Sequence, residues 1–243
     1  MKLMFAGDIH GNTGHLEWLL HYGRASRIDR IVALGDFGYW PRTERGLSFL
    51  ETAQHQAEHY GIPIWWVDGN HDDHGGLHLL TAVHGEDSPI PTPNDWVAYL
   101  PRGCVLEVGG IRLLAYGGAW SMDWMDRIEG LEWWPEERID FDHLEGVGDR
   151  VGRVDILATH ECPAGNPVGY YGEHPVAATQ RLFIGRLVDK VTPRYVFSGH
   201  HHVRQSWSDP VTGADVHVLS RDGTGIESIY IVDTNEIGAP LVA

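Results

Sequence analysis

Residues 2–10 of the chain, KLMFAGDIH, set an unbroken apolar run directly against a glycine, an acid and a histidine. Lys2–Ala6 has the length and composition of a buried strand. Asp8 and His10 follow it two positions apart, and side chains alternate along an extended backbone, so both would point the same way. The stretch therefore predicts a buried strand that delivers two potential ligands at its carboxyl end.

Two further stretches repeat this arrangement. Residues 29–36, DRIVALGD, and residues 64–72, IWWVDGNHD, again lead from an apolar run into glycine and polar residues. Between the three predicted strands, residues 13–24 and 43–60 carry apolar side chains at helical spacing. This alternation of strands and helices favours parallel strands joined by right-handed crossovers.

In the second half of the chain the predicted strands and helices no longer alternate regularly. We expect a hairpin across Gly109-Gly110, two buried strands with a helix between them, and a closing antiparallel pair. The ranges are 105–108 and 111–116 for the hairpin, 155–158 and 195–197 for the strands, 176–188 for the helix, and 216–219 and 228–232 for the pair. The sequence thus predicts a mixed α/β domain with two stacked sheets and helices outside.

Five clusters of metal-type ligands fall where predicted strands end. They are Asp8-Ile9-His10, Gly35-Asp36, Gly69-Asn70-His71-Asp72, Thr159-His160 and Gly199-His200-His201-His202. In open α/β sheets, ligands gather outside the carboxyl ends of the strands. The clusters supply enough carboxylate, amide and imidazole donors for two divalent cations. Such a pair is suited to in-line displacement at phosphorus.

The order and spacing of these clusters resemble the motifs of the calcineurin-like metallophosphoesterase superfamily, D-x-H, G-D, G-N-H-[DE], H and G-H-x-H. The resemblance implies a four-layer αββα sandwich of two mixed sheets flanked by helices. It implies that His71 is the catalytic imidazole, oriented by the carboxylate of Asp72. It also implies the metal ligands, which are Asp8, His10 and His202 at one ion, Asn70, His160 and His200 at the other, and Asp36 bridging both.

Mixed oxygen and nitrogen donors suit transition metals better than Ca²⁺ or Mg²⁺. We expect two divalent transition-metal ions, Mn²⁺ first, with Fe, Zn, Co or Ni as alternatives. Such ions would lower the pKa of a bridging water, and the resulting hydroxide would attack phosphorus in line. A protonated His71 would stabilise the developing charge or protonate the leaving oxygen. His201, at the variable position of the last motif, is expected to point to the opposite face, and Cys162 to be a loop cysteine.

The third cluster favours a phosphodiesterase. Asp68 stands where the phosphatase branch of the superfamily has an arginine before G-N-H. A dianionic monoester gains most from bidentate arginine, and a diester depends less on it. Arg42 could serve as a phosphate clamp, and a plain surface arginine is an equally good interpretation. The form G-N-H-D also resembles the cyclic-nucleotide phosphodiesterase branch, which implies a 2′,3′- or 3′,5′-cyclic nucleotide as substrate.

The aromatic loop, residues 120–137, fits no regular element well. It contains four tryptophans, Trp120, Trp124, Trp133 and Trp134. Two interpretations stay open. The loop could be a lid in which a tryptophan such as Trp124 binds a nucleobase, or it could pack its tryptophans on the body of the domain.

Three alternative functions remain. A phosphomonoesterase or phosphoprotein phosphatase is the second choice. A DNA nuclease is the third, because a formal charge of −16 matches a long polyanion poorly. A catalytically silent metal-binding scaffold would keep the fold without turnover, but a degenerate member is expected to lose a ligand or His71, and this chain retains them all.

Composition limits the number of domains, the cellular compartment and the kind of partner. With 243 residues, 42% of them hydrophobic, the chain fits a single domain over residues 1–243. Its two cysteines make no disulfide framework and indicate a reducing compartment, so we expect the cytoplasm. We find no signal peptide and no apolar stretch near the roughly 20 residues that span a bilayer. The expected partner is a small phosphorylated molecule, a nucleotide first, with no membrane and no long nucleic acid; the oligomeric state stays open.

Overall fold

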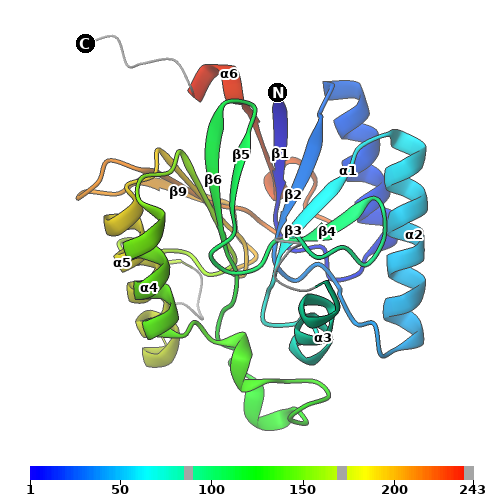
Figure 1. Cartoon of the computed structure of the whole chain (residues 1–243), viewed down its shortest axis with the longest axis horizontal. Coiled ribbons are helices and arrows are strands. Elements are labelled where there is room, and N and C mark those ends of the chain that lie inside the picture. Colours follow the sequence, from blue (N-terminus) through cyan, green and yellow to red (C-terminus); the bar gives the residue numbers. More distant parts are fainter. Residues whose placement is uncertain (85–89, 169–173, 238–243) are drawn as a thin grey trace.

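The computed structural model describes residues 1–84, 90–168 and 174–237. Strands and helices alternate in the first half and become mixed in the second (Figure 1). The elements are β1 (Lys2–Ala6), α1 (Thr13–Ser26), β2 (Arg30–Leu34), α2 (Glu44–Tyr60), β3 (Ile64–Val67), α3 (His74–His84), β4 (Val97–Tyr99), β5 (Val105–Val108), β6 (Ile111–Tyr116), α4 (Phe141–Val151), β7 (Ile156–Thr159), α5 (Pro175–Val191), β8 (Tyr195–Ser198), β9 (Gln205–Ser208), β10 (Asp215–Val218), β11 (Ile229–Asp233) and α6 (Thr234–Ile237).

Two mixed sheets organise these elements. One has the strand order β11-β1-β2-β3-β4, and the other has the order β5-β6-β7-β8-β10-β9. In the first sheet β1 to β4 are parallel and β11 is antiparallel to β1. In the second, β6, β7, β8 and β10 are parallel, with antiparallel β5 and β9 at the edges. The parallel strands bring their carboxyl ends to one end of each sheet.

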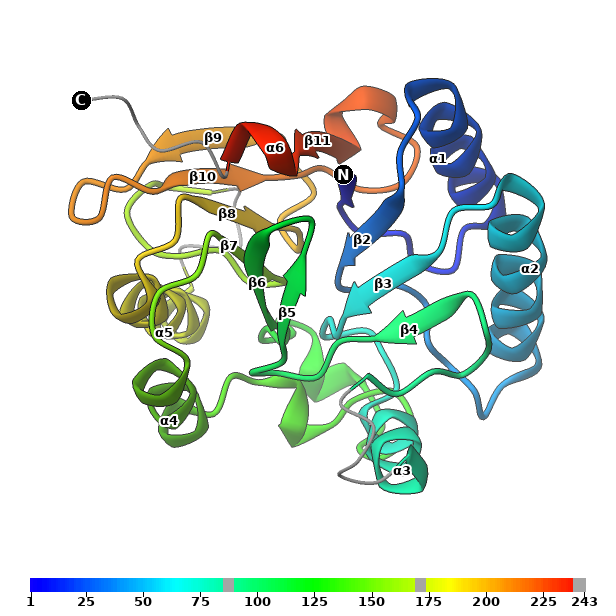
Figure 2. The same ribbon diagram turned by 45° about the horizontal axis from the view of Figure 1, so that its top comes forward.

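The alternation of side chains along the strands builds three hydrophobic layers. In β1, Leu3 and Phe5 belong to the core between the two sheets, whereas Met4 and Ala6 pack with the apolar faces of α1 and α2. On the far side, Leu144 of α4 and Ile184 of α5 cover the second sheet. Figure 2 shows the helix pairs on the two outer sides of the sheets. The predicted four-layer αββα sandwich is confirmed.

The predicted boundaries agree with local capping. Helix α2 begins at Glu44 because the Thr43 side chain accepts a hydrogen bond from the N–H of Gly46, and it ends at Gly61 in the left-handed conformation. The strands predicted at 2–6, 64–67, 105–108 and 111–116 have the predicted bounds. Sequence reasoning did not identify α3, β4, α4 and β9.

The prediction that residues 216–219 and 228–232 form an antiparallel pair is wrong. β10 lies parallel to β8 in one sheet, and β11 lies antiparallel to β1 in the other. One edge of β1 pairs with β2, and the backbone groups on its other edge need hydrogen-bonding partners. β11 provides them along the whole strand, from Asp233 opposite Lys2 to Ile229 opposite Ala6.

The aromatic loop lies at the end of the molecule opposite the N-terminus (Figure 1). It contains two short 3₁₀ turns, Trp124–Asp126 and Pro135–Glu137, and an isolated β-bridge between Glu129 and Trp133. Among the described residues, no helix is long and apolar enough to cross a membrane.

Candidate metal centre and active site

The carboxylate of Asp36 lies between two groups of predicted metal ligands, called the two ligand groups below. Its Oδ2 is 3.6 Å from Nε2 of His10, and its Oδ1 is 3.5 Å from Nε2 of His160. Asp36 follows β2, the central strand of its sheet, and its side chain is buried. Each oxygen therefore faces a different ligand group, which is the arrangement a bridging carboxylate requires.

The first ligand group contains Asp8, His10 and His202. Asp8 Oδ2 is 2.9 Å from Nε2 of His202 and 3.9 Å from Nε2 of His10. The imidazole rings of His10 and His202 meet edge to face at 5.0 Å. Asp8 and His10 come from the end of β1 and His202 from the loop after β8, so the two sheets contribute to one ligand group.

The second ligand group contains Asn70, His160 and His200. Nε2 of His160 is 2.9 Å from Oδ1 of Asn70, and its ring lies 4.9 Å from that of His200. Nδ1 of His160 is 2.6 Å from the carbonyl oxygen of Leu34. Donation to that carbonyl fixes the proton on Nδ1 and leaves Nε2 free as a ligand atom.

The backbone at this centre is strained and tightly packed. Left-handed φ angles occur at four of the predicted ligands: His10 (52°), Asp36 (46°), His200 (66°) and His202 (56°). Such conformations persist in non-glycine residues only where the surroundings enforce them, and they cluster at functional sites. A Cβ at Gly199 would lie 2.3 Å from Oδ1 of Asp8, so only glycine allows this close approach.

Carboxylates and imidazoles shift one another's pKa values in this centre. Burial lowers the pKa of His10 and of His160, but the carboxylates of Asp36 and Asp8 outweigh it and raise the pKa values to about 9 and about 10. Burial alone would raise the pKa of Asp36, yet the imidazoles of His160, His71 and His10 hold it well below its usual range. The same carboxylates that raise the pKa of these imidazoles would also attract a divalent cation, and protons and cations would compete for the site.

The donor set fits divalent cations. Asp8 Oδ2 is buried and lacks a hydrogen-bond donor of good geometry among the described residues, although His202 is close. Asp8, His10 and His202, and likewise Asp8, Asp36 and His160, each bring their ligand atoms within 4.8 Å of one another. Two carboxylates, an amide and four imidazoles suit transition metals.

His71 lies beside the ligands without taking part in either group. Its backbone N–H donates to Oδ1 of Asp36 at 2.8 Å. The resemblance implied that the carboxylate of Asp72 orients the His71 ring, but Asp72 makes its hydrogen bonds elsewhere. The Asp72 carboxylate accepts hydrogen bonds from the backbone N–H groups of Gly38, Tyr39 and Gly69, and it thereby fixes the loops around the ligands.

A guanidinium replaces the expected carboxylate beside His71. Nη2 of Arg127, in the aromatic loop, is 3.2 Å from Nε2 of His71. Burial lowers the pKa of the His71 imidazole, and the positive charge of Arg127 adds to this effect against the opposing influence of Asp36. Sequence reasoning missed Arg127; the Asp123–Arg127 spacing of four residues was the one local signal.

His71 and Arg127 stand between two cavities. The inner cavity, about 310 Å³, is lined by the ligands Asp36, Asn70, His200 and His202 together with Trp120. The outer cavity, about 500 Å³, contains Trp40, Arg45 and Leu131. Both are lined by His71 and Arg127.

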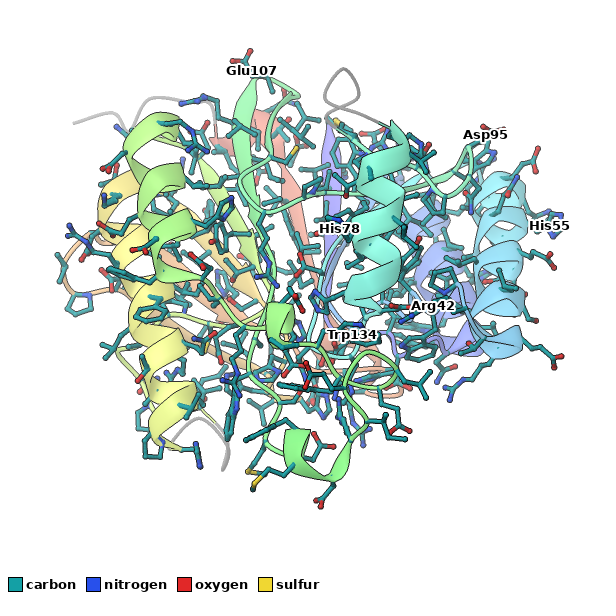
Figure 3. The ribbon with its side chains drawn as sticks, turned by 60° about the horizontal axis from the view of Figure 1, so that its bottom comes forward. Arg42, His55, His78, Asp95, Glu107 and Trp134 are labelled. Carbon is teal, nitrogen blue, oxygen red and sulfur yellow. The ribbon has the colours of Figure 1, made fainter. Side chains whose placement is uncertain are left out.

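The two predicted substrate contacts lie elsewhere. Arg42 forms a bidentate pair with Asp73, with N···O distances of 2.6 and 2.7 Å, and Figure 3 shows it close to Trp134. Trp124 packs against Trp133 at 5.2 Å, and it lines neither the inner nor the outer cavity. Trp120, Trp133 and Trp134 are buried, so the aromatic loop packs most of its tryptophans on the body.

Asp68, which stands where the phosphatase branch has an arginine, is paired within the protein. Its buried carboxylate accepts two hydrogen bonds from Arg102 and one from the hydroxyl of Tyr99. Burial raises the pKa of Asp68, but Arg102 outweighs it and lowers the pKa. The negative charge of Asp68 is therefore neutralised within the protein.

Several side chains outside the two ligand groups contact the predicted ligands and fix their orientation. Asp222 Oδ1 is 3.1 Å from Nδ1 of His10, and Ser121 Oγ accepts from the amide of Asn70 at 3.0 Å. Buried Glu161 lies with Oε2 3.8 Å from Nε2 of His200, while its Oε1 is 2.7 Å from Nε2 of His201. His201 is therefore a buried partner of Glu161. Such outer carboxylates orient metal-binding imidazoles.

Two stacked sheets with metal-type donors gathered at their strand ends are the features that this chain shares with a known family. The chain belongs to the calcineurin-like phosphoesterase family, whose family model matches residues 1–204. Members of this family use divalent metals to hydrolyse phosphoric esters, and the chain is accordingly a phosphoesterase by family. No curated protein matches the chain.

Solved structures share the fold at low sequence identity. The protein TT1561 of Thermus thermophilus is 13% identical with a TM-score of 0.56, over 96% of this chain and 98% of that one. A dimetal phosphatase from Danio rerio is 12% identical with a TM-score of 0.54, over 91% and 87%. GAP50, the anchor in the inner membrane complex of Plasmodium, is 11% identical with a TM-score of 0.54, over 95% and 78%.

Proposed function

We propose that the protein hydrolyses phosphodiester bonds in a small nucleotide, with a cyclic nucleotide as the first candidate. The main support for this proposal is that the inner and outer cavities share His71 and Arg127 as lining residues. In a cyclic nucleotide both ester oxygens belong to one ribose, and the base extends from that ribose away from phosphorus. With phosphorus beside the ligands of the inner cavity, the base can extend into the outer cavity.

The ligand groups described above would hold two divalent transition-metal ions, Mn²⁺ first, with Asp36 shared between them. When bound, these ions supply the charge that polarises the phosphoryl group and lowers the pKa of the attacking water. Two of the imidazoles that would bind these ions are oriented by the protein. The carbonyl oxygen of Leu34 fixes the ring of His160, and the carboxylate of Asp222 fixes the ring of His10. His71, next to Asp36, would protonate the leaving oxygen.

A nucleotide fits the side chains of the outer cavity. Trp40 is half-buried there, and the guanidinium of Arg45 lies 4.9 Å from the centroid of its ring. Aromatic rings and arginine bind bases and phosphates. We also propose that residues 1–243 act as one domain in the cytoplasm, which is compatible with the free Cys104 and Cys162.

Phosphomonoester hydrolysis is the second candidate, and Arg127 is the observation that favours it. A guanidinium beside His71 can bind a dianion, and Asp68 no longer counts against one because Arg102 neutralises it. A silent scaffold is disfavoured because the ligand groups and His71 are all assembled. GAP50, described as an anchor, shares the fold, so the fold alone does not decide this point.

A paired assay tests the proposal. Bis(p-nitrophenyl) phosphate, p-nitrophenyl phosphate and the 2′,3′- and 3′,5′-cyclic nucleotides are compared across a metal panel at one pH. We expect a higher kcat/KM for the diesters and the highest rates with Mn²⁺. An Asp36→Ala preparation controls for contaminating phosphatases. A monoester preference of about tenfold, which corresponds to about 1.4 kcal/mol, would promote the monoesterase.

A further inference from the structure

The Arg127 side chain is poorly explained as a structural ion pair. Its carboxylate partner is Asp123, four residues earlier, at 2.8 Å from Nη2. The Asp123 side chain is 56% exposed, whereas that of Arg127 is only 14% exposed. An exposed i,i+4 pair contributes little to stability, so it does not account for a guanidinium held against an imidazole.

The guanidinium has donors to spare. Its two hydrogen-bonding contacts, to Asp123 and His71, both use Nη2. Within residues 1–84, 90–168 and 174–237, Nε and Nη1 make no hydrogen bond. A largely buried guanidinium whose Nε–H and Nη1–H groups are unpaired among these residues is suited to an oxyanion, to which it can donate charge-assisted hydrogen bonds.

The ligands lie on the same cavity wall as this guanidinium. Arg127 lines the inner cavity with Asp36 and His202, and His71 connects them, because its N–H donates to Asp36. A phosphoryl oxygen in the inner cavity could therefore accept a hydrogen bond from Arg127 on the side that holds the predicted metal ligands.

The ends of the aromatic loop are fixed to the body. Arg102 donates to the carbonyl oxygens of Glu136, Glu137 and Arg138 while it pairs with Asp68. At the other end, the N–H of Ser121 donates to Glu137. Arg127 is thus presented by a loop whose two ends are joined to each other and to the sheet.

We propose that Arg127 binds the non-bridging oxygens of the substrate phosphoryl group and sets the balance between monoesters and diesters. The inference rests on the proposed phosphoesterase function. A monoester dianion offers Arg127 one more charge than a diester monoanion, so the loss of Arg127 should harm monoesters more.

The test measures binding of inorganic phosphate to the Mn²⁺-loaded protein by calorimetry. We expect Arg127→Ala to weaken binding by about 10- to 100-fold, the range for a charged hydrogen-bond pair, with unchanged metal content. Arg127→Lys should recover part of the loss because it keeps the charge and lacks the planar fork. Arg138→Ala is the matched control, since Arg138 lies beside Trp124 and Trp133 at the end of the aromatic loop.

Two results would overturn the inference. One is an Arg127→Ala protein that binds phosphate within about twofold of the wild type, well below the range for a charged pair. The other is an Arg138→Ala protein that loses as much binding, which would indicate loop packing.

The ester assay then tests the specificity role. In Arg127→Ala, kcat/KM for p-nitrophenyl phosphate should fall about tenfold further than for bis(p-nitrophenyl) phosphate. Equal losses would contradict a role in specificity. If the wild type hydrolyses neither ester, the proposed function fails, and the calorimetric comparison still decides whether Arg127 binds phosphate.

Discussion

The ligand groups at the strand ends and the aromatic loop line the same cavity but are held in place differently. Asp8, Asp36 and Asn70 follow adjacent parallel strands, whose backbone ladders fix their spacing. The aromatic loop has no such ladder. It depends on Arg102 and on the contacts of Ser121 and Glu137. Side chains that must keep fixed positions are best placed at strand ends, where the sheet holds them rigidly. Side chains that select a substrate can be placed on a loop.

Asp36→Ala should give the largest effect, because this change removes the carboxylate that both ligand groups share. We expect a rate loss of more than about 10³-fold, towards the upper end of what a single catalytic group contributes, together with lower metal occupancy. Elemental analysis and diester kinetics check both parts. A variant with full metal content and rate would show that the strand-end groups do not act as one centre.

His71→Ala tests the residue where the two regions meet. We expect two bound metals and a rate lower by at least about 10²-fold on substrates with poor leaving groups. The loss should shrink on nitrophenyl esters, whose leaving group needs little protonation. An unchanged kcat on a poor leaving group would remove His71 from the chemistry.

Asp222→Ala tests the support behind the ligands. Asp222 fixes His10 through Nδ1, so its loss should weaken metal affinity by about 10- to 100-fold at constant pH. Metal titration followed by competition with a chelator measures this. Asp233→Ala, which removes a carboxylate near the N-terminus, serves as the control. Equal affinities in both variants would argue that Asp222 is a surface acid.

Trp124→Ala should give the smallest effect. Trp124 packs on Trp133 and Arg138 rather than in a cavity, so KM for nucleotides should change by less than about threefold, under about 1 kcal/mol. A larger increase in KM, with small nitrophenyl diesters unaffected, would restore the interpretation of the aromatic loop as a lid that covers the base.

The strand-end ligands could be predicted because their signals are local. Each lies within four residues of the end of an apolar strand, and sheet topology then brings the strand ends together. Helix α4 was missed because Gly146 and Gly148 weaken its helical pattern. The false pairing of β10 with β11 arose because sequence proximity gives no information about which sheet has a free edge.

The supporting side chains could not be predicted, because their partners are remote in the sequence. Asp222 is separated from His10 by 212 residues and Arg127 from His71 by 56 residues. Nothing near Asp68 in the sequence indicates that Arg102, 34 residues away, would neutralise it. Such contacts depend on the completed fold.

Stepwise metal titration of chelator-treated protein, with bound ions counted while diester hydrolysis is followed, tests whether Asp36 serves two cations. We expect no activity without metal, two ions per chain at saturation, and full rate only when both are bound. Full activity in metal-free protein, or full rate with a single ion, would contradict a centre in which Asp36 serves two cations.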